Sequence, residues 1–388
     1  MTSCYKIIHT TCHTQWGGLE KRIFNESVWM AQKGHTIIIV APSKTPLFNK
    51  AKEYGFKTCA VEFKRIGMIK DYIFLKNLFI NEKPDIVNTH GNEDSQLGLL
   101  AACRAKVGCR ILSRHISAHV GKSWYNKLLY KKLATYIFTT ADYTTNHLKT
   151  VFKLTGKQIF SMPSGILPPE TLLPKNKARN NLAMELELDP DTRFLGFVGR
   201  VSATKGVDTI IKAFQKIAKN IPGHDLVIIG DSTKEYIDSL WALADRMQIK
   251  ERIHIMGLKN DVWPYYRAFD CKILASRSKR GIPFEGVPQA LLEAMYCSCP
   301  VIGSKSGGIP DIIEHDKTGL LFDDEDTDNL ADMIFQLLNE ENDTLKRAQK
   351  AFEMVKKFHT IDTMGRNILR IYKLHRLGLG NMVSPNHL

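Results

Sequence analysis

The sequence predicts an α/β protein made of two doubly wound domains, each built around a parallel sheet. Strand-like runs of β-branched and aliphatic residues alternate with helix-length segments along most of the chain. The 388 residues exceed the roughly 250–300 that a single hydrophobic core holds. The alternation breaks once, in a stretch rich in proline and polar residues, and then starts again.

The N-terminal half shows the alternation clearly. Residues 36–41 carry no polar alternation, which is typical of a strand buried on both faces of a parallel sheet. The expected strands are 5–10, 36–41, 85–90 and 109–115, and the expected helices are 19–33 and 94–106.

The same alternation returns in the C-terminal half. The expected strands are 194–199, 225–230, 252–256, 272–275 and 300–303. The expected helices are 207–219, 234–247, 262–269, 287–296, 327–339, 344–357 and 364–377. We therefore expect an N-terminal domain (1–165), a linker (166–189) and a C-terminal domain (190–360), with a helix at about 361–388 packing back on the N-terminal domain.

Composition and charge limit the classes of protein. With 44% hydrophobic and 24% charged residues, the chain has the composition of a globular protein. Residues 1–165 hold 24 Lys and Arg against 10 Asp and Glu, whereas 166–388 hold 30 of each, so the excess of +14 lies in the first part. Such asymmetry indicates an anionic partner or a solvated basic surface. The cysteine spacing fits neither a disulfide framework nor a zinc site.

Two glutamates eight residues apart form the strongest candidate site. Glu285 precedes the expected helix and Glu293 lies two turns inside it, so both can face one groove. Pro288 suits the first helical turn, because its missing N–H needs no partner there. The helix N-terminus offers N–H groups and a positive dipole to a phosphate. The alternative is that Glu285 caps the helix and Glu293 is a surface charge.

A second candidate is the turn at 199–206. Gly199 follows an expected strand, and glycine allows backbone to approach a ligand closely. Arg200 and Lys205 bring two cations to the carboxyl end of that strand, where a diphosphate would need them. The segment is not a P-loop. A surface turn with two ordinary cations is the alternative.

Weaker candidates lie in the N-terminal half. Gly17 and Gly18 follow the first strand and precede a helix, although a tight turn explains them equally well. His90 and His115 each end a strand, where a side chain can reach a ligand or serve a structural role. Ligands of doubly wound sheets bind at the carboxyl ends of the strands, so we expect a site in the cleft between the domains.

Taken in order, these segments resemble the family 4 (group 1) glycosyltransferases of the GT-B fold. The resemblance implies two Rossmann-like domains facing each other across a cleft, with the acceptor on the N-terminal domain and a nucleotide-sugar donor on the C-terminal domain. It covers essentially the whole chain and is closest over 194–335. The residues that carry it are Gly17-Gly18, Gly199-Arg200, Lys205-Gly206, Glu285 and Glu293, Pro300-Val301-Ile302, Gly307-Gly308-Ile309-Pro310 and Thr318-Gly319-Leu320-Leu321-Phe322.

The resemblance also implies roles for the matching positions. Arg200 and Lys205 would bind the donor diphosphate and stabilise the leaving nucleotide. Glu285 and His115 would contact the transferred sugar, and Glu293 would hold the ribose. The donor-binding positions would be Gly17, Gly18, Gly199, Leu258, Val287, Pro288, Gln289 and Glu293.

The implied reaction transfers a sugar to an acceptor hydroxyl with retention of configuration and without a metal or other cofactor. Two cations and a helix N-terminus would offset the charge that develops on the leaving diphosphate. A metal would need an Asp-x-Asp pattern at a strand end. The acidic run 323–326 could supply one, but we expect it to open a helix at Thr327.

The chain departs from the family pattern at three places. Residues 164–167 read Ser-Gly-Ile-Leu where Asn-Gly-Val-Asp is common. Asp311 stands where a glutamate often follows the second glycine pair, and Ser298 stands where a glycine is common. These differences leave open which nucleotide and which sugar the donor site takes.

The acceptor side carries the positive charge. Segments 57–83 and 122–136 mix lysines with aromatic and aliphatic residues, which is typical of basic amphipathic helices on an anionic membrane. No apolar run approaches the roughly 20 residues of a spanning helix. We expect a cytoplasmic protein, peripheral on the inner face of the cytoplasmic membrane, that glycosylates a glycolipid, lipopolysaccharide or oligosaccharide acceptor. A lysine-rich face in solvent is the alternative.

Two other functions are compatible with the sequence. A sugar-nucleotide epimerase of the same shape would form product without an acceptor. A nucleic-acid-binding protein would explain the charge. However, the chain has no zinc-finger spacing, no RNP-type aromatic motif and no basic low-complexity arm, so we expect no nucleic-acid partner.

Overall fold

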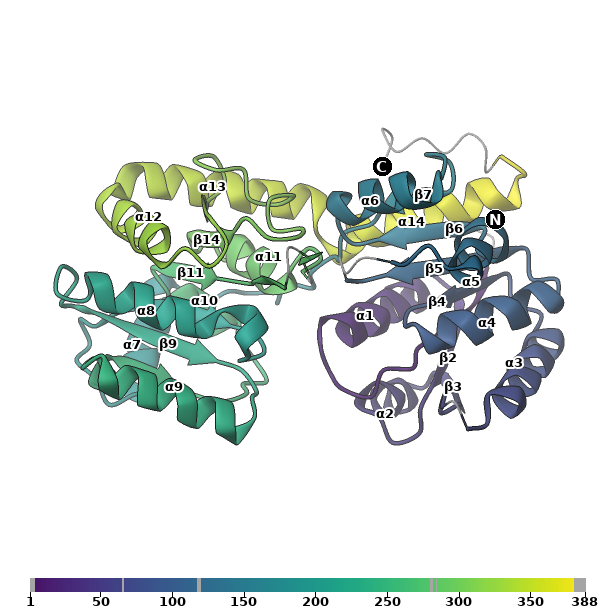
Figure 1. Cartoon of the computed structure of the whole chain (residues 1–388), viewed down its shortest axis with the longest axis horizontal. Coiled ribbons are helices and arrows are strands. Elements are labelled where there is room, and N and C mark those ends of the chain that lie inside the picture. The colour runs from purple at the N-terminus through teal and green to yellow at the C-terminus, as the bar shows by residue number, and fades with distance from the viewer. Residues whose placement is uncertain (1–3, 65, 117–119, 280–281, 284, 380–388) are drawn as a thin grey trace. The chain divides into compact units, whose positions relative to one another are not determined.

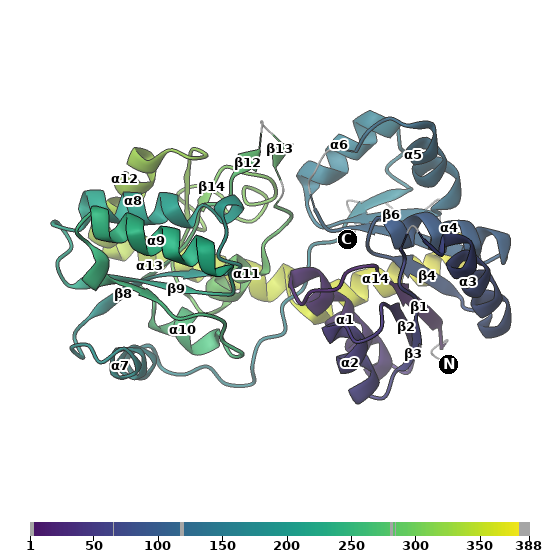
Figure 2. The ribbon, with the colours of Figure 1, turned by 60° about the horizontal axis from the view of Figure 1, so that its bottom comes forward.

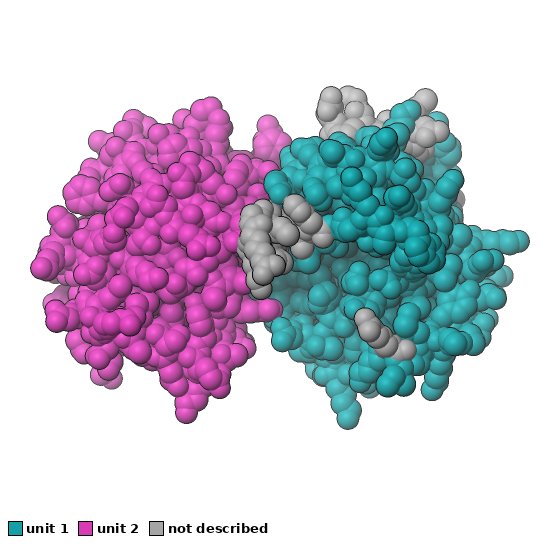
Figure 3. Space-filling model, viewed as in Figure 1, with its two compact units in different colours: residues 1–165, 361–388 teal, residues 166–360 magenta. Residues whose placement is uncertain are grey.

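The computed structural model describes residues 4–64, 66–116, 120–279, 282–283 and 285–379. It divides into two compact units: unit 1 contains 1–165 and 361–388, and unit 2 contains 166–360 (Figure 3). The C-terminal segment therefore belongs with the N-terminal half of the chain. Within the described stretches, no helix combines the length and the apolar character needed to cross a membrane.

Unit 1 is built on a seven-stranded parallel sheet with the strand order β3-β2-β1-β4-β5-β6-β7 (Figure 1). Its strands are β1 (Lys6–Thr10), β2 (Thr36–Ala41), β3 (Lys57–Ala60), β4 (Ile86–Thr89), β5 (Cys109–Arg114), β6 (Tyr136–Thr139) and β7 (Ile159–Ser161). Its helices are α1 (Gly18–Gln32), α2 (Pro46–Glu53), α3 (Met68–Glu82), α4 (Glu93–Arg104), α5 (Trp124–Leu128), a π-helical turn (Leu129–Leu133), α6 (Asp142–Phe152) and α14 (Ile361–Arg376).

Alternating side chains of the strands enter two separate cores. Ile7 packs in the core that includes residues of α1 and α14, whereas its neighbour Ile8 packs in the core that includes residues of α3 and α4. This follows from the strand period of two, which sends successive side chains to opposite faces. Residues 37–41 of β2 are therefore apolar on both faces of the sheet, as the sequence predicts.

Helix α14 belongs to unit 1 although it is the last helix in the sequence of the described residues. It lies against α1, and Figures 1 and 2 show this yellow helix among the purple and blue elements. Trp29 Nε1 donates a hydrogen bond to Asp362 Oδ1 at 3.1 Å. Ile368, Ile371 and Tyr372 are buried in the core on that face of the sheet.

Unit 2 is built on a six-stranded parallel sheet with the order β10-β9-β8-β11-β14-β15. Its strands are β8 (Arg193–Val198), β9 (His224–Ile229), β10 (Ile253–Ile255), β11 (Cys271–Leu274), β14 (Val301–Ser304) and β15 (Leu320–Phe322), with a separate ribbon of β12 (Ser278–Lys279) and β13 (Ile282–Pro283). Its α-helices are α7 (Lys175–Glu185), α8 (Val207–Ile217), α9 (Lys234–Arg246), α10 (Trp263–Ala268), α11 (Gln289–Tyr296), α12 (Thr327–Asn339) and α13 (Glu341–Phe358).

The sheet orders place a switch point in each unit. In unit 1 the order reverses between β1 and β4, and in unit 2 it reverses between β8 and β11. Loops that follow neighbouring strands on either side of such a point leave room for a ligand at the carboxyl edge of the sheet. The strands at these points therefore position the candidate residues.

Most expected elements are confirmed within one or two residues, and 36–41 and 327–339 match β2 and α12 at both ends. Short elements without a clear period escaped prediction, among them β3, β6, β7, α2 and α6. The stretch 166–189, expected as a linker, contains α7. This helix buries Ala178, Leu182 and Ala183 and packs against α10. The sequence did not predict α7 because its first seven residues (175–181) are mostly polar, which hides the helical spacing of the three buried residues.

Two expected amphipathic helices need correction. Segment 57–83 begins as strand β3, and its helix α3 starts only at Met68. Segment 122–136 forms the short helix α5 and a π-helical turn, and Tyr136 already belongs to strand β6. In both cases one end of the segment pairs with a neighbouring strand, and backbone hydrogen bonds to that strand outweigh local helical preference.

Candidate active site

The donor-side candidates lie at the switch point of unit 2. Gly199 and Arg200 directly follow β8, and Arg200 is exposed. Lys205 ends a 3₁₀ turn (Ala203–Lys205) before α8. From the neighbouring strand β11 comes Ser276, two residues after the strand ends. The sheet thus brings two cations and a hydroxyl to one edge from segments about 75 residues apart.

Lys205, Glu285 and Ser276 form one hydrogen-bonded cluster. Lys205 Nζ donates to Glu285 Oε2 in a close ion pair, and Ser276 Oγ donates to the same oxygen at 2.8 Å. The Glu285 side chain is only 14% exposed. Burial alone would raise the pKa of Glu285, but the Lys205 charge and these hydrogen bonds hold that pKa below its usual value. Glu285 is therefore an anion at neutral pH.

Two glycines make this cluster possible. Gly206, at φ +64°, ends the turn that carries Lys205, and a Cβ there would lie 2.0 Å from the carbonyl oxygen of Ala275. Gly307, at φ +57°, packs on the backbone of Glu285, where a Cβ would lie 2.2 Å from its carbonyl oxygen. Gly308 N–H then donates to that carbonyl at 3.1 Å. Both glycine positions therefore fix the backbone that holds the ion pair.

Glu293 lies on α11 with a different partner. Tyr266, from α10, donates a hydrogen bond to Glu293 Oε2 at 3.0 Å, and burial together with this carboxylate raises the Tyr266 pKa well above its ordinary value. Pro288 is the N-cap of α11, one residue before the first turn in which it was expected. Pro288 and Val287 are buried and Gln289 is half-buried. Helix α11 therefore starts between the two glutamates, four residues after Glu285.

Three residues of this region escaped the sequence analysis. Ser276 had a usable signal, since it is a polar residue just past a buried strand. Tyr266 had none, because its contact with Glu293 depends on how α10 packs against α11. Lys272 interrupts the apolar strand β11 and is fully buried, with its Nζ 2.9 Å from the carbonyl oxygen of Ile273 and 5.0 Å from the Phe197 ring. Burial lowers the pKa of Lys272 to about 7.

Leu258 and the acidic run lie at other loops of unit 2. Leu258 follows β10 and is 72% exposed. In the acidic run, Asp326 caps α12 by accepting from Asn329 N–H at 2.9 Å, which confirms the expectation that this run opens the helix. Among the described residues, no group of three His, Cys, Asp or Glu side chains could hold a metal ion.

The unit 1 candidates follow β1 and β5. Gly17 is the N-cap of α1, and its N–H donates to Glu20 Oε2 at 2.8 Å, so the buried Glu20 fixes the start of the helix at Gly18. His115 follows β5, and its ring is hydrogen-bonded to His90 at 2.9 Å. Because β1, β4 and β5 are adjacent parallel strands, these residues share the carboxyl edge of the sheet.

In chemical terms, unit 2 offers cations, a held carboxylate and a helix N-terminus at one edge. This set suits a ligand that has both a negatively charged part and hydroxyl groups, because Arg and Lys bind phosphate oxygens and carboxylates accept from hydroxyls. Unit 1 offers a glycine pair at the start of α1 and a partly buried imidazole.

Comparison with curated proteins finds related enzymes. Over 174 residues the chain is 29% identical to the N-acetyl-alpha-D-glucosaminyl L-malate synthase of Bacillus anthracis, covering 45% of this chain and 43% of that protein. The chain thus spans less than half the length of this relative. It is 25% identical over 353 residues to the UDP-Gal:alpha-D-GlcNAc-diphosphoundecaprenol alpha-1,3-galactosyltransferase of Escherichia coli, covering 86% and 88% of the two chains.

The fold is that of the glycosyltransferase from Rickettsia africae ESF-5, whose crystal structure superposes with a TM-score of 0.84 at 17% identity and covers 96% of this chain and 99% of that one. The crystal structure of Anabaena HepE in complex with UDP-glucose superposes with a TM-score of 0.79 at 16% identity, covering 95% of this chain and 99% of that one. The model of "Glycosyl transferases group 1" matches residues 179–354, and the model of "Glycosyltransferase Family 4" matches residues 16–167. Together the two models span most of the chain and include every candidate site residue. The chain therefore belongs to the family 4 (group 1) glycosyltransferases.

Proposed function

We propose that this enzyme transfers a sugar from a nucleotide-diphosphate donor to a hydroxyl of a lipid-linked acceptor, with retention of configuration and without a metal. Unit 2 binds the donor through Arg200, Lys205, Glu285 and Glu293. Unit 1 binds the acceptor, and its His115 contacts the transferred sugar.

The observation that carries this proposal is the Lys205–Glu285 pair at the switch point of unit 2. Breaking a glycosyl–phosphate bond leaves a growing negative charge on the diphosphate and a cation-like sugar carbon. Lys205 and the exposed Arg200 stabilise the first charge, and the Glu285 carboxylate, kept ionised by Lys205, receives sugar hydroxyls. Because these charges are already in place, the residues supply without a metal the stabilisation that a cation would give.

The named relatives support the donor class. The Escherichia coli relative uses UDP-Gal by its name, and HepE was crystallised with UDP-glucose. The first test is therefore a thermal-shift screen of the whole protein against UDP, GDP, ADP, CMP and their sugar conjugates, with and without EDTA. We expect one diphosphate to raise the melting temperature equally in both conditions, and Arg200→Ala to abolish the rise.

The outcomes of this screen separate the alternatives. No shift with any nucleotide contradicts the proposed donor site, and a shift that EDTA removes contradicts metal independence. Once the donor is known, NMR of the product reports the anomeric configuration, and an inverted product contradicts retention. Conversion of the nucleotide-sugar into its epimer without any acceptor would instead identify an epimerase.

The charge distribution supports a membrane-bound acceptor. Unit 1 holds 28 Lys and Arg against 11 Asp and Glu, an excess of +17, whereas unit 2 holds 26 against 29. Each basic residue near an anionic membrane contributes about 1 kcal/mol to binding. The acceptor of the Escherichia coli relative is, by its name, attached to diphosphoundecaprenol, which is a lipid carrier.

Helix α3 supplies an apolar surface within this basic unit. Ile69, Ile73 and Ile80 are 78%, 51% and 45% exposed, and their spacing places them along one side of the helix. The opposite side packs Leu75 and Phe79 into the core. The exposed isoleucines therefore form an apolar strip in addition to the side of α3 that packs in the core. Such an exposed strip is typical of a surface that binds a membrane.

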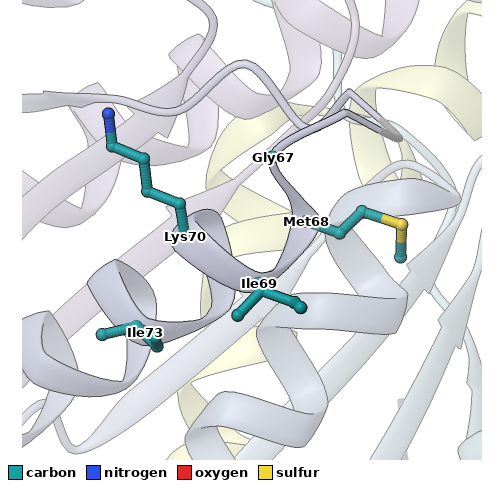
Figure 4. A pocket seen from close by; sticks show the side chains of 5 residues that line it. All are labelled: Gly67, Met68, Ile69, Lys70 and Ile73. Carbon is teal, nitrogen blue, oxygen red and sulfur yellow. The ribbon is translucent and has the colours of Figure 1, made fainter.

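The start of α3 also borders a surface hollow. A cavity of about 580 Å³ is lined by Gly67, Met68, Ile69, Lys70 and Ile73. Figure 4 shows Met68 and Lys70 extending in opposite directions from the first turn, so an apolar and a cationic side chain flank it. We propose that this turn enters the headgroup region of an anionic membrane, with Lys70 at the phosphates.

Vesicle co-sedimentation tests the membrane proposal. We expect the protein to bind phosphatidylglycerol vesicles at low salt and to bind phosphatidylcholine vesicles far less. Ile69→Ser/Ile73→Ser should weaken this binding about a hundredfold or more, because each aliphatic side chain contributes roughly 1.5–3 kcal/mol once it is buried in the membrane. The matched control is Leu345→Ser in unit 2, a residue 58% exposed. Equal binding of both variants contradicts the role of α3.

A further inference from the structure

Three histidines of unit 1 are joined in an unbroken hydrogen-bonded chain. His9 lies in β1, His90 follows β4 and His115 follows β5. His9 Nδ1 is 2.9 Å from His90 Nε2, and His90 Nδ1 is 2.9 Å from His115 Nε2. His9 and His90 are buried, and His115 is half-buried. We call these three residues the histidine chain.

A buried carboxyl group lies at the inner end of the histidine chain. Glu26, on α1, is 1% exposed, and its Oε1 faces His9 Nε2 at 4.0 Å. Among the described residues neither of these two atoms has a hydrogen-bond partner. Two buried, unpartnered polar atoms that face each other indicate a contact that a small side-chain movement closes. Glu26 is thus the acid to which the histidine chain leads.

Other titratable groups lie near Glu26 and the histidine chain. Arg22 is buried beside Glu26 and donates to the carbonyl oxygen of Met162 at 2.5 Å. Asp94 is fully buried too, but it accepts from Thr10 Oγ1 and from two backbone N–H groups rather than from an imidazole. Among the described residues, Tyr372 of α14, His13 and Arg114 also interact electrostatically with Glu26 or with the histidines.

Each imidazole of the histidine chain is neutral. Burial, reinforced by the Arg22 charge, lowers the pKa of His9 to about 3, and burial lowers the pKa values of His90 and His115 well below the ordinary value. A neutral imidazole donates through one nitrogen and accepts through the other. His90 therefore donates to one neighbour and accepts from the other, so the two hydrogen bonds must run in the same direction and the chain has only two arrangements.

We propose that Glu26 is a positioning residue that sets, through His9 and His90, whether His115 Nδ1 donates or accepts a hydrogen bond. Because His115 Nε2 is held by His90, only Nδ1 of that ring is left for a substrate. The inference rests on the proposed role of His115 in the transfer reaction.

The two arrangements differ by one proton. With Glu26 protonated, its O–H donates to His9 Nε2, His9 Nδ1–H donates to His90, His90 Nδ1–H donates to His115 Nε2, and His115 Nδ1 carries a hydrogen. With Glu26 ionised, every bond reverses: His115 Nε2–H donates to His90, His90 Nε2–H to His9, His9 Nε2–H to the carboxylate, and His115 Nδ1 is a lone pair. The proton lost from the acid leaves at His115 Nδ1, and no imidazole becomes charged.

The change between the two arrangements should be half complete near pH 7. Burial raises the pKa of Glu26 to about 7, although the Arg22 charge works against that rise. Above this pH the ionised Glu26 leaves a lone pair on His115 Nδ1, which accepts a hydrogen bond from a hydroxyl of the donor sugar. Below it the same nitrogen carries a hydrogen and loses that contact.

NMR of the full-length protein tests the coupling without any substrate. Long-range ¹H–¹⁵N correlations of ¹⁵N-histidine-labelled protein report the tautomer of each ring, and His115→Asn assigns the His115 signals. We expect the tautomers of all three rings to change together between pH 6 and pH 8. In Glu26→Gln, which has no ionisable group, we expect no change. The control is Glu62→Gln, an exposed glutamate of the same unit, which should behave as the wild type.

Two results would overturn the inference. One is a His115 tautomer that stays constant over this pH range in the wild type, and the other is an equal change in Glu26→Gln. If Glu26→Gln does not fold, His90→Phe breaks the histidine chain and leaves the acid in place. The His115 tautomer should then no longer depend on pH, and a dependence that persists contradicts the relay.

Kinetics separate this inference from the proposed function. In the wild type, kcat/KM should rise about tenfold between pH 6 and pH 8, as for one ionising group with a pKa near 7. In Glu26→Gln, kcat/KM should change by less than about twofold over the same pH range. If no transfer is found with any donor, the proposed function fails, and the NMR result alone still decides whether Glu26 controls His115.

Discussion

Lys205 and Glu285, 80 residues apart in the chain, meet in a direct ion pair in unit 2. Removing the cation by Lys205→Ala leaves a largely buried carboxylate without its main partner, so the Glu285 pKa should rise. We expect kcat to fall by about 10²–10³-fold, the scale of one lost transition-state contact. Steady-state kinetics with a saturating donor measure this fall.

The control for that variant is Lys216→Ala, because Lys216 also forms an ion pair, with Asp328, but on the surface of the same unit. It should keep kcat within about twofold, since exposed ion pairs contribute little. A similar loss in both variants would show that general damage to unit 2, rather than the Lys205–Glu285 pair, explains the effect.

Glu293 and Tyr266 should govern nucleotide affinity rather than turnover. Glu293→Ala should raise the Kd for the nucleoside diphosphate about 10–100-fold, because a charged hydrogen bond contributes about 1.5–3 kcal/mol. Tyr266→Phe removes the hydroxyl that holds Glu293 and should raise the Kd by about tenfold or less. Isothermal titration calorimetry measures both. Unchanged affinity in Glu293→Ala, judged against the exposed control Glu314→Ala, contradicts the assignment.

The buried Lys272 should lower the free energy of unfolding at neutral pH. Its pKa of about 7 in the folded protein lies below the unfolded value, so between pH 7 and about 10.5 the unfolded chain binds more protons and stability rises with pH. Lys272→Met fills the same space without a charge. The variant should unfold at a higher urea concentration than the wild type at pH 7, and the difference should shrink towards pH 10. A difference that is constant with pH would assign the effect to packing alone.

Gly307 should not tolerate a side chain. An alanine there adds the cost of the left-handed backbone, about 1–2 kcal/mol, to an overlap with the Glu285 carbonyl oxygen. Gly307→Ala should lower the melting temperature and weaken nucleotide binding, since the backbone of Glu285 must move. Gly223→Ala is the control, because a Cβ at that position meets nothing within 4 Å. Equal melting temperatures and affinities for the two variants contradict this role of Gly307.

The buried strands were predictable, whereas the short peripheral elements were not. Residues 37–41 are apolar in an unbroken run because both faces of β2 are covered, and such a run can be recognised from the sequence alone. Strand β7 has three residues and α2 has eight, too few to show a period. Their places depend on pairing and packing with segments elsewhere in the chain.

The candidate site divides in the same way. Glu285 and Glu293 stood out by their spacing, and Arg200 and Lys205 stood out by their place after a strand. Ser276 could have been found as a polar residue just past a buried strand. Nothing in the sequence paired Lys205 with Glu285, because that contact depends on neighbouring strands β8 and β11 ending at one edge of the sheet.

The sequence by itself determined the family, the two parallel sheets and the excess of positive charge in the first 165 residues. These properties depend on local composition and on the order of segments along the chain. Only the tertiary structure decided that Lys205 pairs with Glu285 and that His9, His90 and His115 form one chain leading to Glu26. Strand order sets these relationships, because hydrogen-bonded neighbours in a parallel sheet come from distant parts of the sequence.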